Sequence, residues 1–286
     1  NYPAALSGRT HALGRIFDVM GGLLGQSAPD AMNAAGFSDS PHLFYSGYDD
    51  KGEWFQLFQI GFGGVPGRPV GDGPDGHSLW PGFTNVPNEF VEAYFPLRIE
   101  QYETIPDSGG AGLHRGGNGL SVAYRFLAEG TISVHDERWL TYPWGVRGGE
   151  PGMRSTKRLV RADGSSEWLP SKCEGIKVQA GDLLYFNTWG GGGWGDACER
   201  DAQRVAADVR SGLVSQEGAR RYGVVIGQDD CIDEAATAAL RDEIRAARGE
   251  LELFNYGGTI EEIKARCKAE THLDPPVQPT FAKAGG

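Results

Sequence analysis

The sequence contains no apolar run of the ~20 residues that a membrane-spanning helix requires, and it opens without a signal-peptide pattern. Positive charge is scarce: 27 Lys and Arg stand against 38 Asp and Glu, for a net charge of −11. This balance argues against nucleic acid or an anionic membrane as the main partner. Only 4 cysteines occur, with no Cys-x-x-Cys pair. We therefore expect free thiols in a reducing cytoplasm, without a disulfide framework or zinc knuckle.

Common catalytic motifs are also missing. The sequence has no Gly-x-Ser-x-Gly elbow and no His-Glu-x-x-His, and its 6 histidines never fall at i, i+4 spacing. No Lys-Ser/Thr follows a glycine cluster, which excludes a phosphate-binding loop. A dinucleotide fingerprint at residues 112–119 is excluded because a strand-like run follows it, where a helix should begin. Motif chemistry alone therefore assigns no reaction.

Glycine is what the sequence has in excess. Its 44 glycines are about twice the usual share of about 7%, which favours a β-rich architecture with many tight turns. They concentrate in residues 107–119, where 6 of the 13 residues are glycine, and in residues 189–196. Glycine is used where the backbone takes a positive φ or closely approaches another group. We expect two exposed, sharply bent loops here.

The remaining pattern predicts an α+β fold, with a β-rich centre, glycine-rich loops, a helical N-terminal segment and a helical C-terminal region. Apolar residues at helical spacing over residues 10–32 predict a helix that packs in the core and stops at Pro29. Strand and turn signals follow up to Asp196, and helices are predicted at 233–249 and 260–268, with Ser215 as a helix cap. The expected divisions are a β-rich core (1–196), a helical region (197–274) and an extended or disordered tail (275–286).

A polar loop over residues 71–89 is the first site candidate, because rigid sheets tend to place function on their loops. Asp72, Asp75 and His77 could bind a divalent ion or polarise a carbonyl. Turn chemistry, in which such side chains cap their own backbone, is an equal alternative. In the first glycine cluster Arg115 could bind an anion or pair with a carboxylate, and we favour a brace to Asp107.

Three stretches resemble the hydantoinase B/5-oxoprolinase family: residues 94–119, residues 143–152, and residues 190–225 beginning with the second glycine cluster. Their order and spacing fit from residue 1 to about residue 226. The resemblance is to the C-terminal half of the family's subunits, and the segment at residues 1–5 resembles one that lies mid-chain there. The family's metal-binding histidines and aspartates belong to the other half, so no metal ligand is assigned in this chain.

The resemblance implies ATP-dependent carbonyl activation in a cytoplasmic, heteromeric complex. A hydantoinase A-type ATP-binding subunit, holding ATP and Mg, phosphorylates an amide or enolate oxygen, and a dry pocket protects the product. The B-type subunit then directs water onto a cyclic amide of the hydantoin, oxoproline or lactam type. The alternatives are a subunit of an acetone- or acetophenone-type ketone carboxylase, and a non-catalytic scaffold. A second partner chain would carry the N-terminal half and a divalent metal.

For this reaction on a small carbonyl substrate we expect two residues in catalysis, Asp75 and His77. The expected substrate-binding residues are Trp80, His114 and Arg115. The aromatic residues could line a site for an aryl substrate or lie in the core; those considered are Phe44, Tyr45, Trp54, Phe55 and Trp80.

Overall fold

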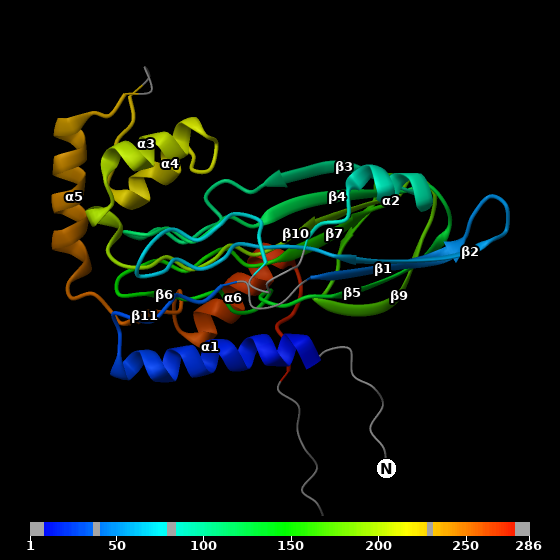
Figure 1. Cartoon of the computed structure of the whole chain (residues 1–286), viewed down its shortest axis with the longest axis horizontal. Helices are drawn as coiled ribbons and strands as arrows, with labels where there is room; N and C mark the ends of the chain where they lie inside the picture. Colours follow the sequence, from blue (N-terminus) through cyan, green and yellow to red (C-terminus); the bar gives the residue numbers. More distant parts are fainter. Residues whose placement is uncertain (1–8, 37–40, 79–83, 228–230, 278–286) are drawn as a thin grey trace, which may run out of the picture.

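Two antiparallel β-sheets, packed face to face, form one end of the molecule (Figure 1). The computed structural model describes residues 9–36, 41–78, 84–227 and 231–277. One sheet has the strand order β2-β1-β5-β9 and consists of β1 (His42–Tyr48), β2 (Trp54–Ile60), β5 (Gly130–His135) and β9 (Lys172–Val178). The other has the order β3-β4-β10-β7-β8 and consists of β3 (Leu97–Thr104), β4 (Leu120–Phe126), β7 (Thr156–Val160), β8 (Ser166–Trp168) and β10 (Leu183–Asn187). The short helix α2 (Asn88–Tyr94) lies beside β3.

The apolar core lies between these sheets and takes side chains from both. Along β2 the residues alternate between exposed and buried, as expected for a strand with one face in the core. Tyr45 is fully buried; its hydroxyl donates to the carbonyl of Ala128 (2.9 Å), and burial raises its pKa to about 12. Tyr45 and Phe55 therefore belong to the core, whereas Phe44 and Trp54 point to the outer face of the sheet.

A bundle of glycine-rich segments continues from one end of the sheets. This glycine bundle consists of residues 62–77, 107–119, 143–153 and 188–195. Backbone hydrogen bonds join each segment to more than one other. The N–H of Gly191 donates to the carbonyl of Gly117 (2.9 Å), and the N–H of Gly117 donates to the carbonyl of Val65 (2.8 Å). A Cβ added at Gly191 would lie well inside 3.0 Å of the backbone of Val65. Glycine is required here because backbones pack directly against one another.

The expectation of exposed, bent loops is therefore wrong for the first glycine cluster. Residues 108–112 and 115–119 are buried. In this stretch, which the structure describes in full, the residue with a positive φ is Asp107 (63°), and none of the glycines has one. Close backbone approach, the other use of glycine, explains the cluster.

Helices cover the far end and one side of the glycine bundle (Figure 1). They are η1 (Ala197–Glu199), α3 (Ala202–Arg210), α4 (Gln216–Ala219), η2 (Arg220–Tyr222), α5 (Glu234–Arg248) and α6 (Ile260–Thr271). Between α5 and α6, β11 (Phe254–Asn255) pairs with β6 (Gly145–Val146) of the bundle. Ser215 caps α4 as predicted, and the two predicted C-terminal helices are confirmed as α5 and α6. The α+β fold class is confirmed; the division at residue 196 stays a prediction.

The predicted N-terminal helix is present as α1 (Arg9–Ser27), but its expected place in the core is wrong. Its large apolar side chains are exposed, with 62% of Leu23 and 69% of Leu24 accessible. The buried positions include Gly14 and Gly25. An amphipathic pattern shows that one face is apolar, but it does not say which side of the helix meets this chain.

Three smaller expectations concern thiols, membranes and the tail. All four cysteines are free thiols. Among the described residues, no helix is both long and apolar enough to cross a bilayer. Residues 278–286 of the predicted tail lie outside the described part of the chain.

Candidate functional site

The predicted polar loop and the first glycine cluster meet through an ion pair. Arg115 donates from Nη1 to Asp75 Oδ1 (2.7 Å) and from Nη2 to Asp75 Oδ2 (2.8 Å). Arg115 therefore forms an ion pair with a carboxylate, as the predicted brace requires, but its partner is Asp75 and not the predicted Asp107. Asp107 instead accepts from the backbone N–H of Ser215 (3.0 Å), which joins the start of the glycine cluster to α4.

A second arginine extends this pair into a network. Arg200 donates to both carboxylate oxygens of Asp72 (2.6 and 2.8 Å) and to Asp208 Oδ2 (2.8 Å). Asp208 Oδ2 also lies 3.7 Å from Arg115 Nε. The side chains of Arg115 and Arg200 are only 6% and 2% exposed. These five residues, the Arg–Asp network, tie the polar loop, the glycine bundle and α3 together.

Sequence reasoning missed Arg200 and Asp208 as members of this site. Arg200 and Asp72 are separated by 128 positions, so no local spacing relates them. Both missed residues fall inside the third stretch of the family resemblance, which was the available signal, although it gave them no role.

The network sets the ionisation of Asp72. Burial by itself raises the pKa of this carboxyl, but hydrogen bonds and charge from Arg200, helped by the backbone N–H of Arg115, outweigh it and hold the pKa below its usual value. A depressed folded-state pKa stabilises the fold above the unfolded pKa of about 3.9. That stabilisation is lost as the pH falls through the folded value.

We therefore expect Asp72→Asn to lower the free energy of unfolding by about 2 kcal/mol at pH 7, and by much less near pH 3. Urea unfolding of the variant and the unsubstituted chain at both pH values measures this. Asp50→Asn, at an exposed hairpin position, is the control and should have no effect at either pH. An equal loss at both pH values would contradict the assignment.

The other predicted site residues lie in different settings. The ring of His114 is tilted against that of Trp194 (5.8 Å between centroids), and its Nδ1 lies 3.8 Å from Asp72 Oδ1. Burial lowers the pKa of His114 despite the opposing charge of Asp72, which favours the neutral form of the ring. His77 is exposed, and the backbone N–H of Ser78 donates to its Nδ1 (2.6 Å). Trp80 lies outside the described residues.

The structure thus brings Asp75, Arg115 and His114 together around Asp72. The catalytic roles predicted for Asp75 and His77, and the substrate-binding roles predicted for Trp80, His114 and Arg115, stay predictions. Within the described part of the chain, no group of three or more His, Cys, Asp and Glu side chains is suited to hold a metal. Asp72 and Asp75 direct their carboxylates at Arg200 and Arg115, which accounts for their role without a cation.

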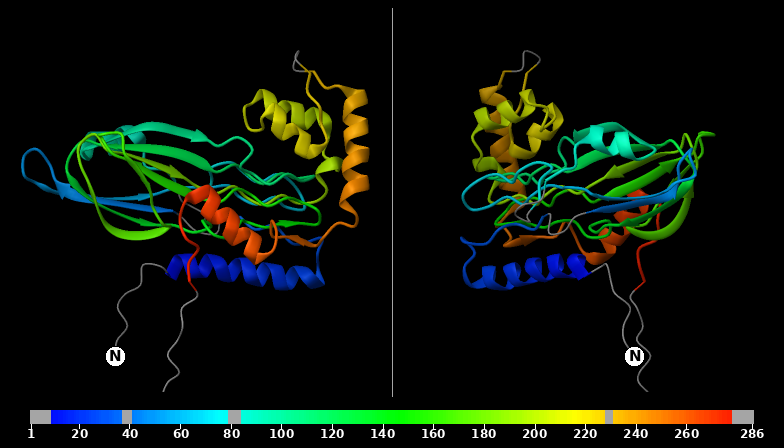
Figure 2. Two further views of the ribbon diagram at one scale, coloured as in Figure 1. Left: turned by 180° about the vertical axis from the view of Figure 1, so that it is seen from behind. Right: turned by 45° about the vertical axis from the view of Figure 1, so that its right-hand side comes forward.

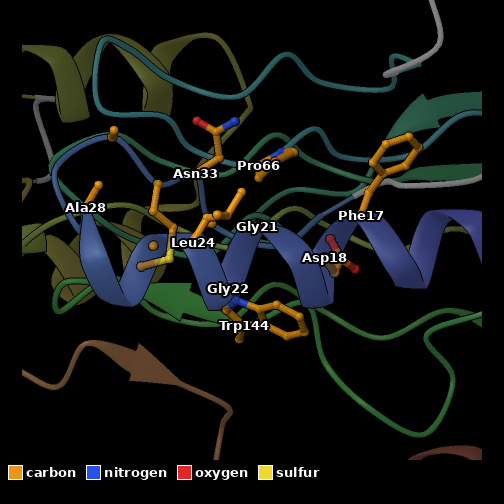
Figure 3. Close-up of a pocket in the computed structure, with 13 residues that line it drawn as sticks. Phe17, Asp18, Gly21, Gly22, Leu24, Ala28, Asn33, Pro66 and Trp144 are labelled. Atoms are coloured by element: carbon orange, nitrogen blue, oxygen red, sulfur yellow. The ribbon is translucent and has the colours of Figure 1, made fainter.

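A cavity of about 610 Å³ lies between α1 and the glycine bundle (Figure 3). Its walls are mainly apolar and include Phe17 and Leu24 of α1 together with Pro66 and Trp144. This volume lies in the range of small-molecule sites. The sequence gave no sign of this cavity, because α1 was expected to pack tightly in the core.

Comparison with known proteins identifies the family of this chain. The family model for hydantoinase B/oxoprolinase matches residues 1–197, which include the sheets, the glycine bundle and the polar loop. The chain belongs to the hydantoinase B/oxoprolinase family. The resemblance inferred from the glycine-rich stretches is thereby confirmed.

Two similar proteins are named as subunits of a hydantoinase and of a caprolactamase. The chain is 30% identical, over 245 residues, to the proposed B-type subunit of a D-/L-hydantoinase from Pseudomonas sp. (strain NS671), covering 84% of this chain and 41% of the relative. It is 35% identical over 159 residues to the beta chain of caprolactamase from Pseudomonas jessenii, covering 54% of this chain and 27% of the relative.

Solved structures show the same fold. The crystal structure of the ATP-dependent caprolactamase from Pseudomonas jessenii matches with a TM-score of 0.66 and 28% identity, over 77% of this chain and 40% of that one. Nucleotide-free acetone carboxylase matches with a TM-score of 0.63 over 86% of this chain and 37% of that one, and at 20% identity it shows the fold alone. The chain therefore spans about two fifths of the length of the similar hydantoinase subunit and of the chain in the caprolactamase crystal structure.

Proposed function

We propose that this chain is part of the B-type subunit of a cytoplasmic, ATP-dependent hydrolase that opens the C–N bond of a cyclic amide. The similarity to the proposed B-type hydantoinase subunit over 84% of the chain is the observation that supports this most. ATP and Mg would be held by a hydantoinase A-type subunit. A further chain, equivalent to the N-terminal half of the family's subunits, would hold a divalent metal.

Within this proposal, the role of each predicted site residue follows from its exposure and its contacts. His77 is exposed and would accept or donate a proton at the ring amide. Asp75 and Arg115 satisfy each other's charge and would hold the polar loop against the glycine bundle. His114, beside Asp72, would hydrogen-bond the substrate together with Trp80. The chain would thus supply positioning and one proton-transfer group.

The reaction class is tested by giving the complete assembly ATP with a hydantoin, with a lactam, or with a ketone and bicarbonate. We expect ADP formation coupled to ring opening of an amide. The similarity to acetone carboxylase makes the ketone carboxylase the second candidate, and fixed carbon from bicarbonate without ring opening would favour it and overturn the hydrolase.

Substitution of His77 tests whether the chain takes part in catalysis at all. We expect His77→Ala to lower kcat about 100-fold in an assembly that elutes intact on size exclusion. His272→Ala, at an exposed histidine that ends α6, is the matched control and should leave kcat unchanged. Unaltered turnover of His77→Ala would favour the non-catalytic scaffold.

A further inference from the structure

The large apolar side chains of the helix α1 are exposed in this chain. Leu23 and Leu24 are 62% and 69% exposed, and further residues between 47% and 56% exposed lie on the same face: Leu13, Ile16, Phe17 and Met20. Several of these positions recur after seven residues (13 and 20, 16 and 23, 17 and 24), so they form one continuous stripe, here called the α1 stripe. Such a stripe is typical of a helix that packs against another apolar surface.

The opposite side of α1 is fixed to this chain by small and charged residues. Gly25 is buried so closely against Met32 that an added Cβ would collide with the Met32 side chain. Arg15 pairs with Glu137 (2.7 Å), and Asp18 pairs with Arg138. These contacts set the rotation of α1 about its axis, so the helix cannot turn its stripe inward without breaking buried ion pairs.

The stripe is large enough to be an interface. Half-exposed side chains of this number and size leave on the order of 500 Å² of apolar surface, the scale at which an exposed patch marks an interaction site. Phe17 and Leu24 belong both to the stripe and to the lining of the 610 Å³ cavity, so the apolar surface continues into a recess. In both views of Figure 2, no helix or strand of the described chain lies beyond α1 on its outer side.

Chain length indicates what covers this surface. This chain spans 41% of the length of its hydantoinase relative and 40% of the caprolactamase chain. In a family-length subunit more than half of the polypeptide therefore lies outside the part that corresponds to this chain. The helix α1 lies inside residues 1–197, which the family model matches, so the segment that carries the stripe is part of what this chain shares with the family.

We propose that the α1 stripe is the docking surface for the polypeptide equivalent to the rest of a family-length subunit. That polypeptide would cover the stripe with an apolar helix face, because a seven-residue repeat of large side chains matches a second helix crossing at about 20°. It would also place an apolar side chain in the recess beside Phe17. The inference rests on the proposed function for the existence of this partner, and adds where the partner binds.

The test is the affinity of this chain, residues 1–286, for that polypeptide, measured by isothermal titration calorimetry. Ile16→Glu/Leu23→Glu places two charges in the stripe, at positions already exposed in the chain alone, so its own thermal unfolding should not change. We expect the Kd to rise about 100-fold or more, because buried apolar anchors dominate interface energetics. The matched control is Ala12→Glu/Gln26→Glu, which adds the same charge at exposed positions of α1 beside the stripe and should leave the Kd within about twofold.

Each contrary result overturns the docking assignment. These results are an unchanged Kd for the stripe variant, equal weakening by both variants, failure of the two polypeptides to associate, or a homodimer of this chain that the stripe variant alone dissociates. The ATP-dependent turnover of the complex is measured separately from the Kd. An active complex insensitive to the stripe contradicts only the docking surface, and an inactive complex that depends on the stripe contradicts only the proposed function.

Discussion

Gly191→Ala is expected to lower the free energy of unfolding by more than about 3 kcal/mol. The added methyl group would lie well inside 3.0 Å of backbone atoms of Val65 and Pro66, and no flexible side chain can move to make room. Relief requires the two segments to separate, which breaks the backbone hydrogen bonds between them, from Gly64 to Trp189 and from Gly67 to Gly192. Urea unfolding followed by circular dichroism measures the loss, and a variant that precipitates on expression agrees with it.

The matched control is Gly21→Ala in the exposed part of α1. No described atom lies within 4 Å of a Cβ at Gly21, and this glycine has no positive φ. Alanine should therefore leave stability unchanged or raise it by up to about 1 kcal/mol through helix propensity. If Gly191→Ala and Gly21→Ala behaved alike, the glycine bundle would not be held by direct backbone contact.

Arg200→Met is expected to cost about 3 kcal/mol or more in the free energy of unfolding. Methionine keeps much of the volume but leaves Asp72 and Asp208 without the guanidinium that joins them. Arg200→Lys should recover little, because a single ammonium cannot reproduce two parallel hydrogen bonds to Asp72 and a third to Asp208.

The control for Arg200 is Arg210→Met, at the exposed end of α3, which should change stability by less than about 0.5 kcal/mol. A double-mutant cycle between Arg200→Met and Asp72→Asn isolates the pair, and we expect a coupling of at least about 1 kcal/mol. Additive losses would mean that the Arg–Asp network does not act as a unit.

The parts of the fold that were predictable from sequence depend on local signals. The cap at Ser215 and the helix predicted at 233–249 are set by backbone groups a few residues away. The strand and turn signals before Asp196 are local as well, as the hairpin of β1 and β2 shows. Such signals do not depend on the rest of the chain, so the elements predicted from them are present in the structure.

The glycine bundle was misjudged because glycine has two uses that look alike in a sequence. Positive φ and close approach both favour a missing Cβ, and only the structure shows Gly191 against Val65. The partner of Arg115 was misjudged for a related reason. Asp107 is nearer in sequence, but Asp75, 40 positions away, is the residue that meets it in space.

Sequence reasoning found only some of the residues of this cluster, and their functional roles stay predictions. Asp75, Arg115 and His114 do gather around Asp72, whereas Arg200 and Asp208 were missed and the α1 cavity had no sequence signal. Its walls come from α1, from Pro66 and from Trp144. No local pattern relates segments so far apart.

The most direct test of the account is ATP-dependent ring opening in a reconstituted assembly of this chain, the polypeptide equivalent to the rest of the subunit, and the A-type subunit. We predict that amide hydrolysis and ADP formation appear together, and that omitting ATP or any one polypeptide abolishes both. Ring opening by this chain alone, without ATP, would contradict the account.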